Sequence, residues 1–175
     1  MLDLTARAAA DLLEIHHNSA TLFITKIRKI IAYYLEIKAL EIFDGEIKLD
    51  ESYFGCTSKG KPCRGATNKM IVFGLLKRNG VAYTVVIRDT KSSTLMSVIA
   101  KKITPDSIVY TDQWRSYNAL DDAGFCHHRI NCSNRFANGK NHINGIKNFW
   151  NQAKRILRKY NSIPKESFPL FLKKC

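Results

Sequence analysis

The sequence lacks any long apolar run, and this absence excludes an ordinary membrane-spanning helix. None of its 175 residues belongs to an apolar stretch of about 20, the length that a transmembrane helix needs. The N-terminus also lacks a basic segment followed by an apolar core and a cleavage site, so the sequence predicts no secretion signal. We therefore expect a cytoplasmic protein without a membrane partner.

Paired cysteines are missing as well. The five cysteines form no C-x-x-C pair, and an odd number without a secretion signal is typical of reduced thiols. One cluster does occur, made of Cys126, His127, His128 and Cys132. Its spacing matches no common zinc finger or ribbon. A structural zinc module therefore stays open only as an alternative to a strand flanked by two half-buried thiols.

Acidic residues are few, and the imbalance indicates a polyanionic partner. The chain has 28 Lys and Arg against 15 Asp and Glu, a net charge of +13. Such a surplus is most simply explained by nucleic acid, although a basic surface without a specific partner is the plainer alternative. The apolar fraction of 45% is ordinary for a globular chain, with room for one main domain and a small appendage.

The first forty residues predict a small helical segment. Residues 5–36 read as two helices broken at 14–18, with Ser19 or Thr21 as the expected N-cap of the second. The second helix carries apolar residues at nearly helical spacing: Leu22, Ile24, Ile27, Ile30, Ile31 and Tyr34. Residues 1–40 are therefore interpreted as a partial helix-turn-helix DNA-binding segment, with any small amphipathic helical pair as the alternative.

Residues 41–175 predict an α/β domain. Expected strands cover 46–54, 70–77, 81–88, 107–111 and 127–131, and expected helices cover 92–102, 117–123 and 141–160. This order of three strands, helix, strand, helix, strand and helix is that of the RNase H-like fold. We expect a mixed sheet flanked by helices and preceded by the small helical segment.

Two acids stand where expected strands end. Asp50 follows Glu46–Leu49, and Asp112 follows Ser107–Thr111. Carboxylates at the ends of neighbouring strands can share divalent metal ions, and paired metal ions cut and join phosphodiesters. A third acid normally completes such a site from a helix. Ordinary strand-end or turn carboxylates are the alternative.

A turn-rich basic segment follows the first of these acids. Residues 55–69 contain Lys59, Lys61 and Arg64 among glycine, proline, serine and threonine. A basic loop beside a metal site suits a phosphate backbone. We predict DNA contacts for these three residues, with a solvated hairpin loop as the alternative.

Several motifs in register resemble a known family. Asp50–Gly55, Val72–Arg78, Asp106–Asp112 and His142–Ile146 are similar to the corresponding runs of DDE transposases of bacterial insertion sequences. The resemblance covers about residues 40–172. It is strongest to the group whose integrase-like domain follows a zinc ribbon and a helix-turn-helix.

The resemblance implies roles for particular residues. The first and second catalytic acids fall on Asp50 and Asp112, which would hold Mg²⁺ or Mn²⁺. The third is a Glu seven residues before a DNA-contacting Lys; that Lys matches Lys154, which places the acid position at Lys147. Arg155 and Arg158 extend the expected DNA contact. The implied function is two-metal DNA strand cleavage and transfer on double-stranded element ends and target, with a homo-oligomer on DNA left open.

The chain departs from the family pattern at a critical place. Lys147 replaces the third acid, which changes the charge at the catalytic position by two units. Cys132 stands where the family usually has His, and the terminal segments of the family are expected to be missing. The chain is therefore interpreted as a truncated or decayed copy with impaired cleavage. The alternative is a non-catalytic DNA-binding remnant.

Overall fold

The structure is a computed structural model that describes residues 4–55, 69–78, 80–130, 143–160, 163–173 and 175. The chain divides into two compact units. One unit comprises residues 41–150, and the other comprises residues 1–40 and 151–175. The predicted boundary at residue 40 therefore coincides with a unit boundary, while 151–175 group with the N-terminal residues. The assignment of 1–40 as a partial DNA-binding segment stays a prediction.

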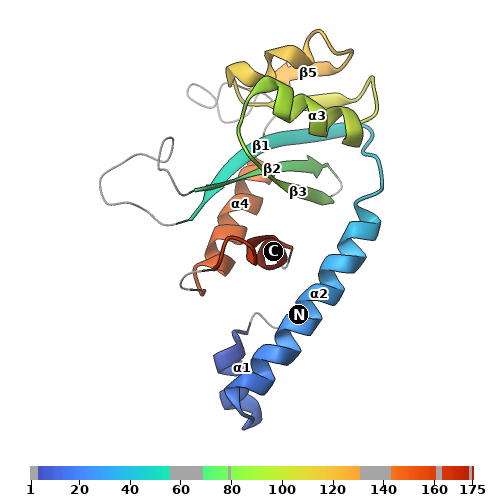
Figure 1. Cartoon of the computed structure of the whole chain (residues 1–175). Coiled ribbons are helices and arrows are strands. Elements are labelled where there is room, and N and C mark those ends of the chain that lie inside the picture. Colours follow the sequence, from blue (N-terminus) through green and yellow to red (C-terminus); the bar gives the residue numbers. More distant parts are fainter. Residues whose placement is uncertain (1–3, 56–68, 79, 131–142, 161–162, 174) are drawn as a thin grey trace, which may run out of the picture. The chain divides into compact units, whose positions relative to one another are not determined.

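A five-stranded mixed sheet forms the larger unit (Figure 1). Its strands are β1 (Glu46–Phe54), β2 (Met70–Lys77), β3 (Ala82–Ile87), β4 (Ile108–Thr111) and β5 (Cys126–Arg129), in the order β3-β2-β1-β4-β5. The first three strands pair antiparallel, while β4 and β5 run parallel to β1. This topology confirms the predicted RNase H-like fold.

One face of the sheet packs on the main apolar core. Residues of β1 alternate between the two faces, and Ile47 and Leu49 are fully buried in the core cluster. The helix α3 (Ser92–Lys102) contributes Leu95 and Ile99 to the same cluster. This face holds the sheet together through apolar burial.

The 3₁₀-helix η1 (Arg115–Leu120) completes that core and corrects a prediction. We expected an α-helix over 117–123. Tyr117 and Leu120 are both fully buried, three residues apart. A 3₁₀-helix has three residues per turn, so this spacing directs both side chains to the core.

The other face of the sheet packs on α4 (Asn144–Leu157). A Cβ added at Gly74 of β2 would collide with the ring of Trp150, and one added at Gly145 would lie 3.2 Å from Leu76 Cδ2. Ile143, Ile146 and Trp150 are buried. The glycine in the middle of β2 thus lets the indole lie directly against the sheet, because a side chain there would push it away.

Helices build the smaller unit: α1 (Ala6–Leu13), α2 (His17–Lys38), the end of α4 and α5 (Phe168–Leu172). The predicted cap of the second helix is wrong, because α2 begins at His17 and its N-cap is His16. The His16 Nδ1 atom accepts a hydrogen bond of 3.2 Å from the backbone N–H of Asn18. A ring nitrogen here takes the place that a hydroxyl oxygen usually has. None of the helices in the described ranges is long and apolar enough to cross a membrane.

Candidate active site

Asp50 lies on the α4 face of the sheet. Its position in β1 pairs with Gly74, the residue that contacts Trp150. Lys48 and Ser52 share this face by alternation, and both are buried. β1 has the expected bounds 46–54, and Asp50 is the fifth of its nine residues, so the expectation that Asp50 ends a strand is wrong. It does lie just beyond the part of β1 that pairs with β4.

Asp112 follows the last residue of β4 and continues the same register. Glu46 pairs with Ile108 and Lys48 with Tyr110, each pair being 62 residues apart, and Asp112 follows Asp50 by the same 62. In a parallel ladder, residues in register point to the same face. The Asp112 carboxylate accepts a hydrogen bond of 2.9 Å from the Trp114 backbone N–H, which fixes the turn after β4.

The electrostatics of Asp50 reflect this placement. Burial raises the pKa of its carboxyl to about 7, and the negative charges of Glu51 and Asp112 act in the same direction. The positive charge of Lys147 opposes the rise. Near neutral pH, Asp50 therefore exchanges between its neutral and charged forms.

Glu51 lies on the opposite face of β1, as alternation predicts. Its Oε2 accepts a hydrogen bond of 2.8 Å from the hydroxyl of the buried Tyr117 in η1. Burial first, and then the Glu51 charge, raise the pKa of Tyr117 well above its ordinary value, so the phenol stays protonated and donates. Glu51 is thus a structural partner of the core side and not a candidate third ligand.

Lys147 occupies the side of the site that α4 covers. It is half-buried in the first turns of α4, directly after the buried Ile146. Its effect on Asp50 shows that the ammonium group lies within electrostatic reach of that carboxyl. The charges of Asp112 and Lys147 thus both act on Asp50, although the structure tests no catalytic role for the three residues.

This donor set is a poor match for two divalent ions. Within the described ranges, no three His, Cys, Asp or Glu side chains gather as a group that could hold a metal ion. Mg²⁺ and Mn²⁺ favour oxygen ligands, and the site offers two carboxylates beside a cation. The residues present therefore do not fit a metal pair.

Lys48 is a charged residue of this face that the sequence prediction did not include. It is only 8% exposed, and its ammonium lies 3.6 Å from the Cβ position of Gly145 in α4. Burial lowers its pKa, the charge of Arg78 adds to the decrease, and Glu46 opposes it. The sequence could have indicated this, because residues two apart in a strand, such as Lys48 and Asp50, lie on the same face of the sheet. Burial of this lysine can be recognised only once α4 is known to cover that face of the sheet.

Three of the predicted DNA-binding residues belong to the other unit. Lys154 and Arg155 lie in the last turn of α4, and Arg158 follows it, all within the unit of residues 1–40 and 151–175. Arg155 and Arg158 are exposed, while Lys154 is half-buried. Lys59, Lys61 and Arg64 lie outside the described residues.

The alternative zinc cluster is only partly described, because Cys132 lies outside the described residues. His127 points to one side, where it contacts Thr111 Oγ1 and Asp121 Oδ1 at 2.7 Å each. His128 points to the other side, where it stacks on Tyr110 and lies 3.6 Å from Cys126 Sγ. The two adjacent imidazoles therefore have different partners, which does not favour one shared metal ion.

Comparison with known families decides the ancestry of the chain. A family model of the ISXO2-like transposase domain matches residues 42–174. The chain belongs to this transposase family. The match confirms the resemblance to insertion-sequence transposases and covers every residue of the candidate site.

One sequence relative agrees with the transposase family. An uncharacterized transposase-like protein of Haemophilus influenzae is 58% identical over 93 residues, which are 53% of this chain and 76% of that protein. Among solved structures, a Mos1 transposase paired-end complex with the left transposon end is 11% identical, with a TM-score of 0.45. The match covers 98% of this chain and 66% of the Mos1 chain. The Mos1 strand transfer complex has a TM-score of 0.38. Because these TM-scores are low, the fold is assigned from the order and direction of the strands.

Proposed function

We propose that this transposase-family chain binds double-stranded DNA and that its cleavage chemistry is impaired by Lys147. The proposal is supported by the positive charge of Lys147 and the negative charge of Asp112, both of which act on the Asp50 carboxyl. The intact reaction implied by the family is two-metal cleavage and transfer of DNA strands during insertion-sequence transposition. The alternative function, a DNA-binding remnant without chemistry, differs only in whether any cleavage survives.

The charge at the site supports impairment. In the intact arrangement, Mg²⁺ or Mn²⁺ would supply the positive charge that stabilises developing negative charge at the phosphate. Here Lys147 supplies positive charge without an oxygen ligand, and two carboxylates remain. Loss of a carboxylate ligand weakens divalent binding, and the repulsion of the added cation acts in the same direction.

DNA binding rests on separate features. The net charge of +13 favours a polyanion, and the exposed Arg155 and Arg158 follow the family position of Lys154. If several phosphates are neutralised, the logarithm of affinity falls linearly with the logarithm of salt, by about 0.9 per phosphate contacted. A homo-oligomer on DNA is compatible with this function.

The deciding experiment measures metal-dependent nicking of the DNA that flanks the gene. It compares the chain as given with Lys147→Glu and with Lys147→Gln, which removes the cation without adding a carboxylate. We expect little cleavage by the chain as given, more by Lys147→Glu, and loss of that gain in Lys147→Glu/Asp50→Ala. Robust cleavage by the unchanged chain, abolished by Asp50→Ala, would refute impairment.

A second readout does not depend on activity. Added Mg²⁺ should raise the melting temperature of Lys147→Glu more than that of the given chain or of Lys147→Gln, because only Lys147→Glu gains an oxygen ligand. Equal Mg²⁺ stabilisation of all three proteins would show that position 147 does not face the metal ligands. DNA affinity that stays flat as salt rises would reject the nucleic-acid partner.

A further inference from the structure

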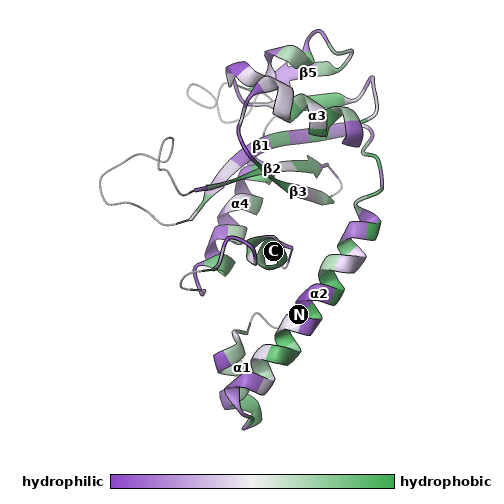
Figure 2. Ribbon diagram, viewed as in Figure 1, coloured by the Kyte–Doolittle hydropathy of each residue, from purple (hydrophilic) through white to green (hydrophobic). Residues whose placement is uncertain are grey.

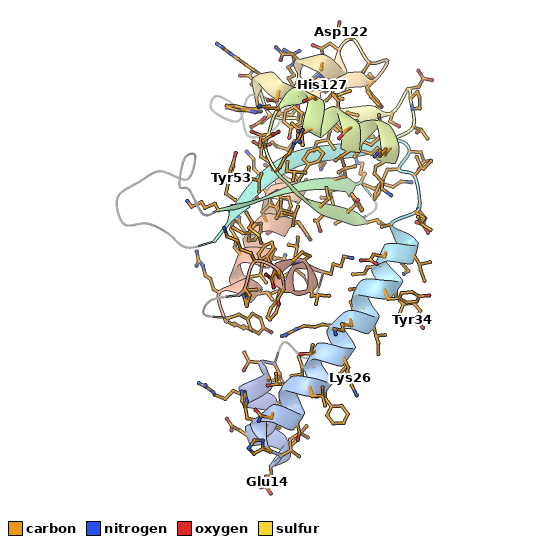
Figure 3. All side chains as sticks on the ribbon, in the orientation of Figure 1. Glu14, Lys26, Tyr34, Tyr53, Asp122 and His127 are labelled. Atoms are coloured by element: carbon orange, nitrogen blue, oxygen red, sulfur yellow. The ribbon has the colours of Figure 1, made fainter. Side chains whose placement is uncertain are left out.

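One face of α2 carries a row of large apolar side chains that the described structure leaves exposed. Along the helix, apolar residues recur throughout (Figure 2). We define the α2 seam as five of them, all between 47% and 64% exposed: Phe23, Ile27, Ile30, Tyr34 and Ile37. In Figure 3, the Tyr34 side chain projects outward from α2. An exposed apolar row of this length typically marks an interaction site.

The spacing of the seam is that of a coiled coil. Its residues follow one another by four, three, four and three positions, which is the a/d pattern of a heptad repeat. The seam therefore suits packing against one other helix.

The rest of the unit already uses the opposite side of α2. The Arg28 guanidinium lies 3.9 Å from the ring centroid of Phe171 in α5, and Glu36 pairs with Lys173. Ala32, between them, is buried. At 3.6 residues per turn, Arg28, Ala32 and Glu36 lie on the side of the helix away from the seam. The folded unit thus holds α2 in place and leaves the seam outward.

We propose that the α2 seam binds the α2 seam of a second copy of this chain. The five seam positions contain no charged residue, so the surface can meet itself across a two-fold axis without burying a charge. The flanking heptad positions nearest the seam hold Lys26 and Lys38 and no acid. In a parallel pair, Lys26 would face Ile31 and Lys38 would face Tyr33, so like charges do not oppose each other.

The area is sufficient for a reversible dimer. Five side chains that each lose on the order of 100 Å² on each copy would bury roughly 1,000 Å² in total, near the lower limit for a specific interface. Tyr33 and Leu40 are also exposed and occupy heptad positions that flank the seam, where they would add to this area. This dimer is independent of the cleavage chemistry proposed above.

Sedimentation equilibrium of the nuclease-treated full chain tests the proposal. We expect a dimer that Ile30→Glu or Tyr34→Glu weakens on the order of 100-fold, because each copy places the charge in the interface. The matched control is Leu22→Glu, an equally exposed apolar residue of α2 outside the seam, which should retain the dimer. Both seam positions are exposed, and circular dichroism checks that each variant folds.

Salt dependence separates this contact from association through DNA. Two copies of a chain with charge +13 repel each other, so raising salt from 0.1 to 0.5 M should leave the dimer intact or strengthen it. A monomeric wild-type chain would overturn the proposal, whether or not another segment of the same chain covers the seam. So would a dimer that survives both seam substitutions, one that Leu22→Glu disrupts equally, or one that dissociates in salt or after nuclease treatment.

Discussion

Two neighbouring carboxylates of β1 have opposite environments. Glu51 faces the core side of the sheet, where Tyr117 donates a hydrogen bond of 2.8 Å to it. Asp50 faces the α4 side, where burial and the charges of Glu51 and Asp112 raise its pKa to about 7. Adjacent residues of one strand therefore include a carboxylate that accepts a hydrogen bond and a carboxylate whose charged form is disfavoured by burial and repulsion. Carboxylates held together against their own repulsion are typical of sites that bind cations or protons.

The largest expected effect comes from the Glu51 side. Tyr117 is 1% exposed and fills the core between η1 and the sheet. Tyr117→Ala should lower the free energy of unfolding by about 3–5 kcal/mol, because it leaves a cavity. Tyr117→Phe keeps the ring and removes only the hydroxyl that serves Glu51, at a cost of about 1–2 kcal/mol. Urea unfolding measures both, and equal losses would show that the hydroxyl matters more than the ring.

Asp50→Asn, in contrast, should raise the free energy of unfolding at neutral pH. The folded pKa of about 7 lies above the ordinary value of 3.8, so the folded state holds its proton more tightly than the unfolded state. Wild-type stability from this group is present at pH 4 and is lost as the pH rises towards 7, by at most about 1.4 kcal/mol per pH unit. At pH 7.5 without metal, Asp50→Asn should therefore stabilise the fold by on the order of 1–2 kcal/mol.

The comparison with Glu51 supplies the control for that measurement. Glu51→Gln keeps a hydrogen-bond acceptor for Tyr117 but weakens that bond, and it removes one of the charges that raise the Asp50 pKa, so its gain at pH 7.5 should be smaller than that of Asp50→Asn. Thermal unfolding of both variants and the wild type at pH 4 and pH 7.5 distinguishes the two faces. An Asp50→Asn gain of the same size at both pH values would contradict the raised pKa.

The division between the faces was predictable from the sequence. A period of two along 46–54 places Asp50 and Glu51 on opposite sides, and the hydrogen bond from Tyr117 confirms the Glu51 side. The order of strands and helices predicted the sheet topology. These features depend on local periodicity, which a sequence displays directly.

Features that depend on distant partners were not predictable. The burial of Lys48 depends on Gly145, almost a hundred residues later in the chain. The His16 cap was missed because histidine is not a usual capping residue. A distant segment therefore decides the burial of Lys48, whereas the His16 cap is a local contact made by an unusual residue type.

The smallest expected effect tests whether the positive charge of Lys147 stabilises the Asp50 carboxylate when no metal ion is present. Lys147 lowers the pKa of Asp50 against the larger causes that raise it. Lys147→Met, without metal at pH 7.5, should therefore lower the stability by about 0.5–1 kcal/mol, within the range for a partly exposed charge pair. At pH 4, where Asp50 is protonated, the same substitution should lose this penalty. The penalty should also vanish in the Asp50→Asn background, which a double-mutant cycle measures.

Lys154→Met, a matched change of a half-buried lysine on the same helix, should show no coupling to Asp50. An equal effect of Lys147→Met with and without Asp50 would mean that the ammonium does not interact with this carboxylate.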